Sequence, residues 1–393
     1  MFADVPATPP DPILGLSAIV KGDERRERID LTAGVYRDAT GSTPPFETVE
    51  AATRAVVDDM QDWGYLPIAG HRGYRDRVSR FVLADAYDSV ADRSWCVQSP
   101  GGTGALAVAS AFARRVASGT IWLPAPTWPN HPAIARQGGL DVRTYRYGDE
   151  TAVWGDAVLE DLAAAGAGDV ILVHACCHNP TGNDPDAELW ADLAALLRDR
   201  GAVVLLDAAY LGLGRGFAAD RCAVDVMVAA GVDLLVAVSF SKTMSLYRER
   251  VGALVGVAPT AAAAANTLGN VEAVVRPMYS NPPAFGARVA ATVLGDPGLR
   301  GRWETEVAAL QERLAAIRRQ VAAGLAARGV DLMPTIEHQA GMFAMTGLDA
   351  DAVGRLRSQF AIYVLDNGRA NLAGLADDAA IDAFCTAVAT VTS

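Results

Sequence analysis

Short apolar strands that alternate with helical stretches constrain this chain more than any other sequence feature. Between about Ala91 and Ala258, β-branched runs occur at 120–124, 169–175, 202–207, 234–239 and 251–257. Ala- and Leu-rich stretches typical of helices lie between them, near 104–116, 131–137, 157–165, 186–200 and 221–230. Parallel strands need crossover connections, usually helices, so the alternation predicts a mostly parallel sheet covered by helices. The region is therefore predicted to be an α/β domain.

A long amphipathic stretch follows this region. From Pro297 to about Arg328, apolar residues recur at the helical spacing of three and four, which predicts one long helix that bridges two domains. Short strands are then expected at 342–345, 362–365 and 370–372, and a last helix at about 378–391. This order predicts a second, smaller α+β domain. The opening residues hold four prolines without a periodic pattern and are expected to form an extended arm.

Composition excludes several classes of protein. The 393 residues are 51% hydrophobic and 20% charged, a profile typical of a folded globular protein. The formal net charge of −12 repels phosphate backbones, so nucleic-acid binding is not expected. No apolar run approaches the roughly 20 residues of a membrane span, and no secretory pattern opens the chain, so a cytoplasmic protein is expected. The five cysteines lack Cys-x-x-Cys spacing and are predicted to be reduced thiols without a metal.

The basic residues are almost all arginine. Of the 34 basic residues only Lys21 and Lys242 are lysine. Because the chain otherwise uses arginine, a lysine suggests a function that arginine cannot perform. A primary amine can lose its proton and form a covalent bond with a carbonyl carbon, whereas a guanidinium stays protonated. Lys21 lies in a charged stretch and is expected to be a solvated surface residue. Lys242 is the candidate nucleophile.

Polar side chains follow the predicted strands at their carboxyl ends, where ligands bind in open α/β sheets. Asn179 follows the strand at 169–175, Asp207 and Tyr210 end the strand at 202–207, and Ser239 and Lys242 follow the next one. Each residue alone has a structural interpretation as a turn residue, a helix cap or a polar strand end. Their convergence on one edge favours a functional site.

Two further features predict an anion site. The segment Ser99-Pro-Gly-Gly-Thr-Gly precedes a predicted helix, whose first amides could bind a phosphate, although it matches neither common nucleotide loop. Arg250 follows Lys242 on the same arm and could bind a phosphate through two hydrogen bonds. A reactive amine, an anchored phosphate and a carboxylate at Asp207 together suggest pyridoxal 5′-phosphate, which has an aldehyde, a phosphate and a ring nitrogen that needs an anion.

These segments give the chain a family resemblance. In order, it contains Asp11-Pro-Ile-Leu-Gly-Leu, Gly34-Val-Tyr, Pro100-Gly-Gly-Thr-Gly-Ala-Leu, Trp128-Pro-Asn-His, Cys176-Cys-His-Asn-Pro-Thr-Gly, Ser239-x-Ser-Lys, Glu249-Arg-Val-Gly-Ala, Tyr279-Ser-Asn-Pro-Pro-Ala and Gly368-Arg-x-Asn. The chain resembles the aspartate aminotransferase family over nearly its whole length. The resemblance implies the fold type I architecture of pyridoxal-phosphate transferases. Its implied parts are an arm at 1–11, a small domain at 12–43 and 308–393, and a large cofactor-binding domain at 44–307.

The resemblance also implies a role for each matching residue. Lys242 would bind the cofactor aldehyde and then act as the base, and Asp207, supported by His131, would pair with the ring nitrogen. Tyr210 and Asn179 would bond the ring hydroxyl oxygen, and Trp128 would stack on the ring. The phosphate would be bound by the following set: Gly101, Gly102, Thr103, Ser239, Arg250 and, from a neighbouring subunit, Tyr65.

Substrate binding and assembly are implied in the same way. Arg369 would bind the substrate α-carboxylate, with Gly34, Trp128 and Asn179 beside it, and Arg276 of the neighbouring subunit would bind a distal carboxylate. A homodimer with shared active sites would therefore exchange an amino group between aspartate or glutamate and a 2-oxo acid.

The chain also departs from the family pattern. It has Thr243-Met-Ser after the lysine, Ala33 where a larger aliphatic residue is common, Pro67 and Ala69 in the Tyr65 loop, and Phe285 in place of a histidine. These differences leave open a lyase or β/γ-replacement enzyme on the same scaffold. A cofactor-binding regulator without catalysis is a further alternative.

Overall fold

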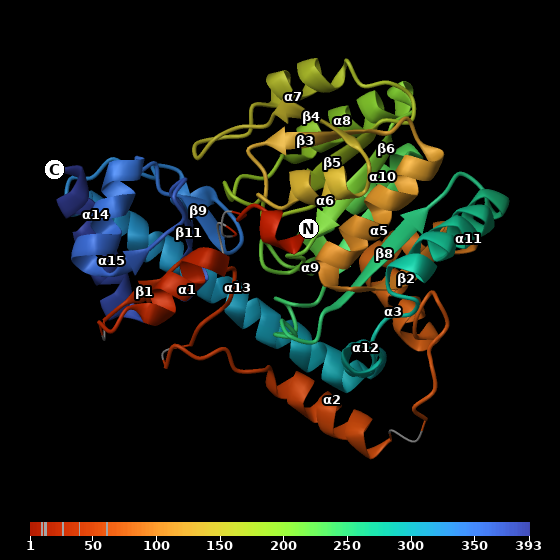
Figure 1. Ribbon diagram of the computed structural model, residues 1–393, viewed down its shortest axis with the longest axis horizontal. Coiled ribbons are helices and arrows are strands. Elements are labelled where there is room, and N and C mark those ends of the chain that lie inside the picture. Colours follow the sequence, from red (N-terminus) through yellow and green to blue (C-terminus); the bar gives the residue numbers. More distant parts are fainter. Residues whose placement is uncertain (9–10, 12–13, 26, 39, 60–61) are drawn as a thin grey trace.

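A seven-stranded sheet forms the centre of the larger of two units (Figure 1). Its strands are β2 (Ser94–Pro100), β3 (Thr120–Ala125), β4 (Asp141–Arg146), β5 (Val170–His174), β6 (Val203–Ala208), β7 (Asp233–Ser239) and β8 (Val251–Val257). Their order is β2-β8-β7-β6-β5-β3-β4, and neighbours are parallel except where β8 pairs with β7 and β2. This computed structural model describes residues 1–8, 11, 14–25, 27–38, 40–59 and 62–393. The predicted mostly parallel sheet is confirmed.

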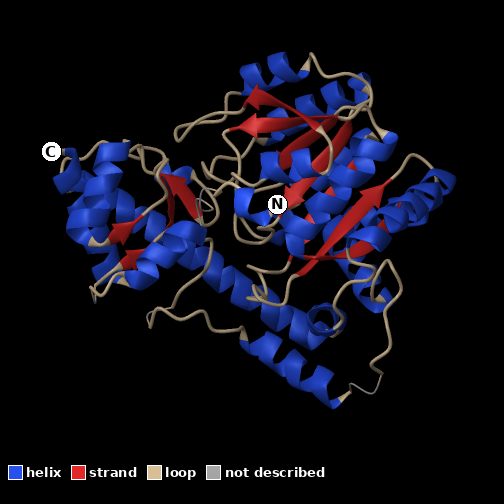
Figure 2. Cartoon of the chain, viewed as in Figure 1, coloured by secondary structure: helices blue, strands red, loops and turns tan. Residues whose placement is uncertain are grey.

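Helices cover both faces of this sheet (Figure 2). One face packs against α5 (Gly101–Val116), α6 (His131–Gln137) and α11 (Ala261–Met278). The opposite face packs against α3 (Arg72–Leu83), α7 (Gly155–Leu162), α8 (Ala187–Arg200), α10 (Cys222–Ala230) and α12 (Phe285–Gly295). Further helices of this unit are α2 (Glu47–Asp58), α4 (Tyr87–Val90) and α9 (Phe217–Asp220).

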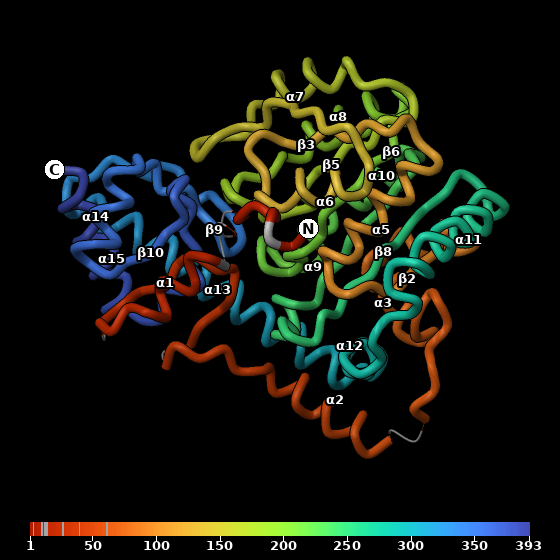
Figure 3. Tube along the Cα trace, viewed as in Figure 1, coloured from red at the N-terminus to blue at the C-terminus, as the bar shows by residue number. Residues whose placement is uncertain are grey.

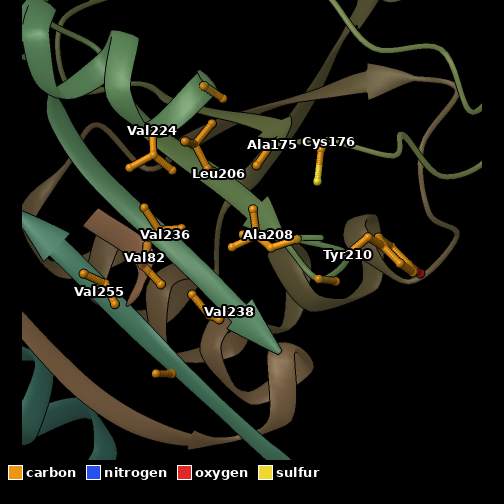
Figure 4. Packing of buried hydrophobic residues seen from close by; sticks show 14 of the residues in the cluster. Val82, Ala175, Cys176, Leu206, Ala208, Tyr210, Val224, Val236, Val238 and Val255 are labelled. Atoms are coloured by element: carbon orange, nitrogen blue, oxygen red, sulfur yellow. The ribbon is translucent and has the colours of Figure 1, made fainter. Parts of the chain in front are cut away.

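Side-chain alternation along the central strands produces the two faces. Leu205 and Leu235 belong to the hydrophobic cluster under α5, whereas Leu206 and Val236, one residue further on, belong to the cluster on the other face. Figure 4 shows Leu206, Val236 and Val255 from three neighbouring strands in that second cluster, close to Val82. Because successive strand residues point to opposite faces, apolar runs buried on both sides read as continuous in the sequence.

The smaller unit has its own core. It contains α1 (Leu14–Gly22), β1 (Ile29–Asp30), β9 (Phe343–Met345), α14 (Ala350–Phe360), β10 (Ile362–Tyr363), β11 (Arg369–Asn371) and α15 (Asp378–Thr392). The strand β1 pairs in parallel with β10, and β9 pairs antiparallel with β11. In the view of Figure 3 the C-terminal end lies at the outer side of this unit, while the N-terminal end overlies the larger unit.

One long helix, α13 (Pro297–Ala326), belongs to both cores, and Figure 1 shows it running from α12 toward the smaller unit. Its residues up to Leu314 pack with the core of the larger unit, and those from Ile317 onward pack with the core of the smaller unit. The predicted bridging helix is therefore present. The exact domain boundaries predicted from the sequence, 12–43 with 308–393 and 44–307, stay a prediction.

Three strands were absent from the sequence prediction: β1, β2 and β4. The strand β1 has only two residues, too few to show an alternating pattern. The strand β2 mixes buried polar residues such as Gln98 and Ser99 with apolar ones, so its pattern is not that of an apolar run. The strand β4 lies at the edge of the sheet and exposes Asp141 and Arg143 to Arg146 except for the buried Tyr145. No helix in the described part of the chain is long and apolar enough to cross a membrane.

Trp303 on α13 provides a test of this packing. It is fully buried against Phe81 and Phe217, with ring centroids 5.5 and 4.9 Å away, and its Nε1 donates to the Thr243 carbonyl oxygen at 2.6 Å. Trp303→Ala should lower the free energy of unfolding by about 3–5 kcal/mol, since it leaves a large cavity. Trp303→Phe should cost less, about 1–3 kcal/mol, since it mainly leaves that carbonyl without its donor.

Urea unfolding followed by circular dichroism measures both effects. The matched control is Val57→Ala on α2, because this side chain is largely exposed. Its effect should stay within about 0.5 kcal/mol. A Trp303→Ala protein as stable as this control would contradict the packing described.

Candidate active site at the carboxyl edge of the sheet

A cavity of about 200 Å³ opens where β5, β6 and β7 end, next to a second one of about 510 Å³. The strand register places Asp207 beside His174 and Ala237, so the chain segments that follow these residues meet at one edge. The first cavity is lined by the predicted residues Gly34, Gly102, Thr103, Trp128, Asn179, Asp207, Tyr210, Ser239, Lys242 and Arg250. Arg369 lines the second cavity. The structure therefore brings most of the predicted site residues together.

Asp207 is a buried carboxylate of which one oxygen takes part in a hydrogen bond. Its Oδ2 lies 3.1 Å from His131 Nε2, and His131 Nδ1 lies 2.7 Å from the Thr127 hydroxyl. Burial alone would raise the pKa of Asp207, but the hydrogen bond from His131 and the neighbouring His174 and Lys242 outweigh it and hold the pKa below its usual value. Its Oδ1 is buried without a hydrogen-bond partner among the described residues. A carboxylate with a spare acceptor fits a protonated ring nitrogen of a bound ligand.

Lys242 is the buried amine of the site. Its Nζ lies 4.8 Å from the ring centroid of Tyr210. Burial lowers the pKa of Lys242 to about 8, with Arg250 and Arg369 acting in the same direction and Asp207 in the opposite one. A substantial fraction of this amine is therefore neutral near pH 8, as a nucleophile or a base requires.

The amino end of α5 and Arg250 form an anion cradle. Gly101, the first residue of α5, has φ +72°, and a Cβ there would lie 2.5 Å from Arg250 Nη2, so the close approach requires glycine. Arg250 has a left-handed backbone, with φ +53°, and donates from Nη1 to Ser241 Oγ at 3.3 Å. Ser239 Oγ donates to the same hydroxyl at 3.1 Å. Helix amides, two hydroxyls and a guanidinium are groups that bind phosphate.

Arg369 is buried on the other side of Asn179. Its Nη1 donates to Asn179 Oδ1 at 3.1 Å and its Nη2 to the Thr32 carbonyl oxygen at 2.7 Å, while the guanidinium carbon lies 4.2 Å from the Phe343 ring centroid. Burial lowers the pKa of Arg369 to about 10, so the group stays charged at neutral pH. Its Nε is buried without a partner in the described part of the chain. A cation without a counter-ion beside an open cavity fits a substrate carboxylate.

Two predicted residues lie outside both cavities. Tyr65 is 95% exposed, and Arg276 is exposed and donates to the Ser280 hydroxyl. Among the described residues, neither side chain lines the cavities in this single chain. Their predicted roles therefore require a second chain.

Residues at the cavities to which the sequence analysis gave no role include Ser241, Tyr247 and Phe343. Tyr247 lines the first cavity, and its hydroxyl oxygen accepts a hydrogen bond from the Tyr36 amide at 3.2 Å. Its position on the arm between Lys242 and Arg250, which also carries Ser241, was a usable signal. Phe343 lines the second cavity, and a Cβ on Gly34 would lie 2.7 Å from its ring. Nothing in the local sequence around Phe343 indicated this position.

The histidines near the site have hydrogen-bond partners of their own. His174 Nδ1 accepts the Asn179 amide at 3.0 Å, and burial lowers the pKa of His174 to about 3. His178 stacks on Tyr147, with ring centroids 3.9 Å apart. Cys176, Cys177 and Asp220 place possible ligand atoms within 4.8 Å of one another, but the Asp220 carboxylate already accepts three backbone amides. The absence of a metal stays a prediction.

Comparison with known proteins gives consistent matches. The family model "Aminotransferase class I and II" matches residues 26–388. An aspartate aminotransferase of Haemophilus influenzae is 41% identical over 383 residues, which cover 96% of this chain and 97% of that protein. An aromatic-amino-acid aminotransferase of Pseudomonas aeruginosa is 38% identical, with 99% and 98% covered. The crystal structure of an aromatic-amino-acid aminotransferase of Burkholderia pseudomallei, covalently bound to pyridoxal phosphate, superposes with a TM-score of 0.95 at 36% identity and full coverage of both chains.

The lowered pKa of Lys242 predicts how the rate of its reaction with an aldehyde depends on pH. Only the neutral amine attacks an aldehyde, so the rate of covalent attachment of pyridoxal phosphate to the apoprotein should rise with pH and level off, with a midpoint near pH 8. Absorbance during reconstitution between pH 6 and 10 measures this rate. Nα-acetyllysine is the control, and its midpoint should lie near pH 10.4. A protein midpoint as high as that of the control would contradict the buried environment of Lys242.

Proposed function

The chain belongs to the class I and II aminotransferase family, and on that premise we propose that it exchanges an amino group between aspartate or glutamate and a 2-oxo acid. It is a pyridoxal-phosphate-dependent aminotransferase. The alternatives of a lyase, a replacement enzyme or a noncatalytic regulator are not favoured, because the relatives that match over nearly the whole chain are named aminotransferases.

The observation that carries the proposal is the placement of Lys242. Its amine lies near two guanidinium groups, that of the exposed Arg250 and that of the buried Arg369, and both help burial to lower its pKa to about 8. Arg250 is part of the anion cradle, and Arg369 lines the second cavity. The site therefore provides a reactive amine between two places for anions.

The bound cofactor supplies an electron sink for the pair of electrons released when the substrate α-carbon loses its proton. We propose that Lys242 takes that proton and later returns a proton during the transfer. Asp207, held as an anion by His131, would keep the ring nitrogen protonated through its free Oδ1. Tyr210 and Asn179 would bond the ring hydroxyl oxygen, and Trp128 would cover the ring.

The remaining residues would bind the cofactor phosphate and the substrate α-carboxylate. The cradle of Gly101, Gly102, Thr103, Ser239 and Arg250 would bind the phosphate. Arg369 would bind the substrate α-carboxylate through its free Nε, with Gly34 leaving space beside Phe343. Fixing a carboxylate at one end and a phosphate at the other orients the α-carbon toward Lys242.

We further propose a cytoplasmic homodimer in which Tyr65 and Arg276 reach into the partner's site. Support comes from the exposure of both side chains, since tyrosine and arginine at an open surface are enriched at interfaces. The cytoplasmic placement is supported by the free state of all five cysteines.

A second candidate substrate class is aromatic amino acids. Ala33 and Ala133 line the second cavity, where small side chains leave space for a large substrate. Relatives at similar identity carry names of both kinds, aspartate and aromatic. Comparing kcat/KM for aspartate and phenylalanine with 2-oxoglutarate as acceptor ranks the two classes.

Arg276→Asp tests the dicarboxylate preference. If Arg276 binds the distal carboxylate, kcat/KM for aspartate and glutamate should fall by about 100-fold or more, because like charges would face each other in a desolvated site. Phenylalanine should be affected much less. Steady-state kinetics measures the ranking, and Arg319→Asp, a charge reversal at an exposed position of α13, is the matched control. An unchanged substrate ranking with a lowered melting temperature would assign Arg276 a structural role instead.

Complementation tests the shared site. Lys242→Ala should abolish turnover, and Arg276→Asp should nearly abolish it for aspartate. Coexpression of the two chains should restore about a quarter of the parent activity, because half of the randomly paired dimers would carry one site with both native residues. Activity that stays at the level of the single variants, although sedimentation shows mixed dimers, would contradict the contribution of Arg276 from the partner.

A further inference from the structure

The most unusual charged residue outside the site is Arg318 on α13. It is only 2% exposed, and among the residues that the structure describes its hydrogen bonds go to carbonyl oxygens and to no carboxylate. A buried guanidinium is costly unless every donor finds an acceptor, so such a residue calls for a specific set of partners. Burial lowers the pKa of Arg318 to about 10, and the group remains charged at neutral pH.

All acceptors of Arg318 come from one segment, residues 336–343, which we call the wall segment. Its Nη1 donates to the Ile336 carbonyl oxygen at 3.5 Å and to Gln339 Oε1 at 3.2 Å. Its Nη2 donates to the carbonyl oxygens of Ala340, Gly341 and Phe343, at 3.1, 2.9 and 2.8 Å. Between a short 3₁₀ turn at Ile336–His338 and the start of β9 at Phe343, the segment is irregular, and Arg318 gathers carbonyl oxygens along its whole length.

The wall segment ends at the substrate cavity. The Phe343 ring lies under the guanidinium of Arg369 at 4.2 Å and meets the Tyr210 ring edge-on at 5.9 Å. The Ala340 amide donates to the Gly182 carbonyl oxygen at 2.7 Å, which ties the segment to the loop that carries Asn179. The wall segment thus contacts two residues that line the second cavity, Arg369 and Tyr210, and Phe343 lines that cavity itself.

The position of Arg318 along α13 adds a mechanical argument. It follows Ile317, where the helix passes from the core of the larger unit to the core of the smaller one. A guanidinium at this junction fixes the wall segment to the one helix that both cores share. Phe343 and Arg369 then keep a constant position relative to the cofactor cavity.

We propose that Arg318 is a positioning residue that sets the affinity of the enzyme for the substrate α-carboxylate by holding Phe343 beneath Arg369. The inference rests on the proposed role of Arg369. Arg318 is not among the residues that line either cavity, and its chain of contacts leads through Phe343 to Arg369. Its replacement should therefore alter substrate binding and leave cofactor binding intact. A lysine cannot replace it, because one ammonium group lacks the planar fork that reaches all these carbonyl oxygens.

The test uses Arg318→Lys in the holoenzyme, with succinate as the probe, because succinate has two carboxylates and no amino group to react. Calorimetric Kd for succinate should rise about tenfold, and KM for aspartate should rise in parallel. The kcat should stay within about threefold of the parent, and the cofactor content and its absorbance should not change. Hydrogen exchange should be faster in residues 336–343.

Three further variants make the result specific. Arg319→Lys, the same change at the next and exposed position, should leave every quantity unchanged. Val321→Ala, in the core of the smaller unit, should lower the melting temperature without a change in succinate Kd. Phe343→Leu should raise the Kd as Arg318→Lys does, and the double variant should show no further loss, since the two residues act in one chain of contacts.

Two results would overturn the proposal. A lowered melting temperature of Arg318→Lys with unchanged succinate Kd would give this arginine a stabilising role only. If Arg369→Lys leaves the Kd of succinate unchanged, the carboxylate role of Arg369 is wrong, and the proposal that depends on it fails for that separate reason.

Discussion

The need to bury several charges in one small space governs this structure. Asp207 and Arg369 are buried, and Lys242 half-buried, at the carboxyl edge of the sheet, where an unpaired charge is expensive. Each is supported by groups from distant parts of the chain: His131 for the aspartate, Asn179 and the Thr32 carbonyl for the arginine. The sheet brings these supports together because its parallel strands all end at the same edge. Within the described residues, Asp207 Oδ1 and Arg369 Nε have no hydrogen-bond partner, and these atoms mark where a ligand could bind.

Much of the fold follows from local sequence. Strands β3 and β5 to β8 are short apolar runs, and the helices between them were placed within a few residues of their observed ends. The exceptions have physical reasons. The strand β4 faces water at the sheet edge, and β2 buries polar residues such as Gln98, which accepts from the His71 amide and donates to the Pro283 carbonyl oxygen. These hydrogen-bond partners are distant in the sequence, so no periodic pattern around Gln98 predicts a buried strand.

The residues of the site likewise include some that the sequence predicts and some that it does not. The rule that ligands bind at strand ends was enough to single out Asn179, Asp207 and Lys242 from the residues alone. Arg369 and Gly34 came only from the family resemblance, since nothing near them has a distinctive pattern. Phe343 and Arg318 were found by neither route. An arginine whose acceptors are backbone carbonyl oxygens and one amide side chain leaves no complementary acidic residue in the sequence to reveal it.

The scarcity of lysine has a practical consequence for anyone who handles this protein. Lys21 lies exposed near the end of α1 in the smaller unit, and the other lysine is enclosed within the site. Reagents that couple to amines therefore meet one accessible lysine and the amino terminus. Immobilisation or dye attachment through Lys21 would give molecules of nearly uniform orientation, with the label held away from the cavities. Proteases that cut after lysine would likewise leave the folded chain almost whole.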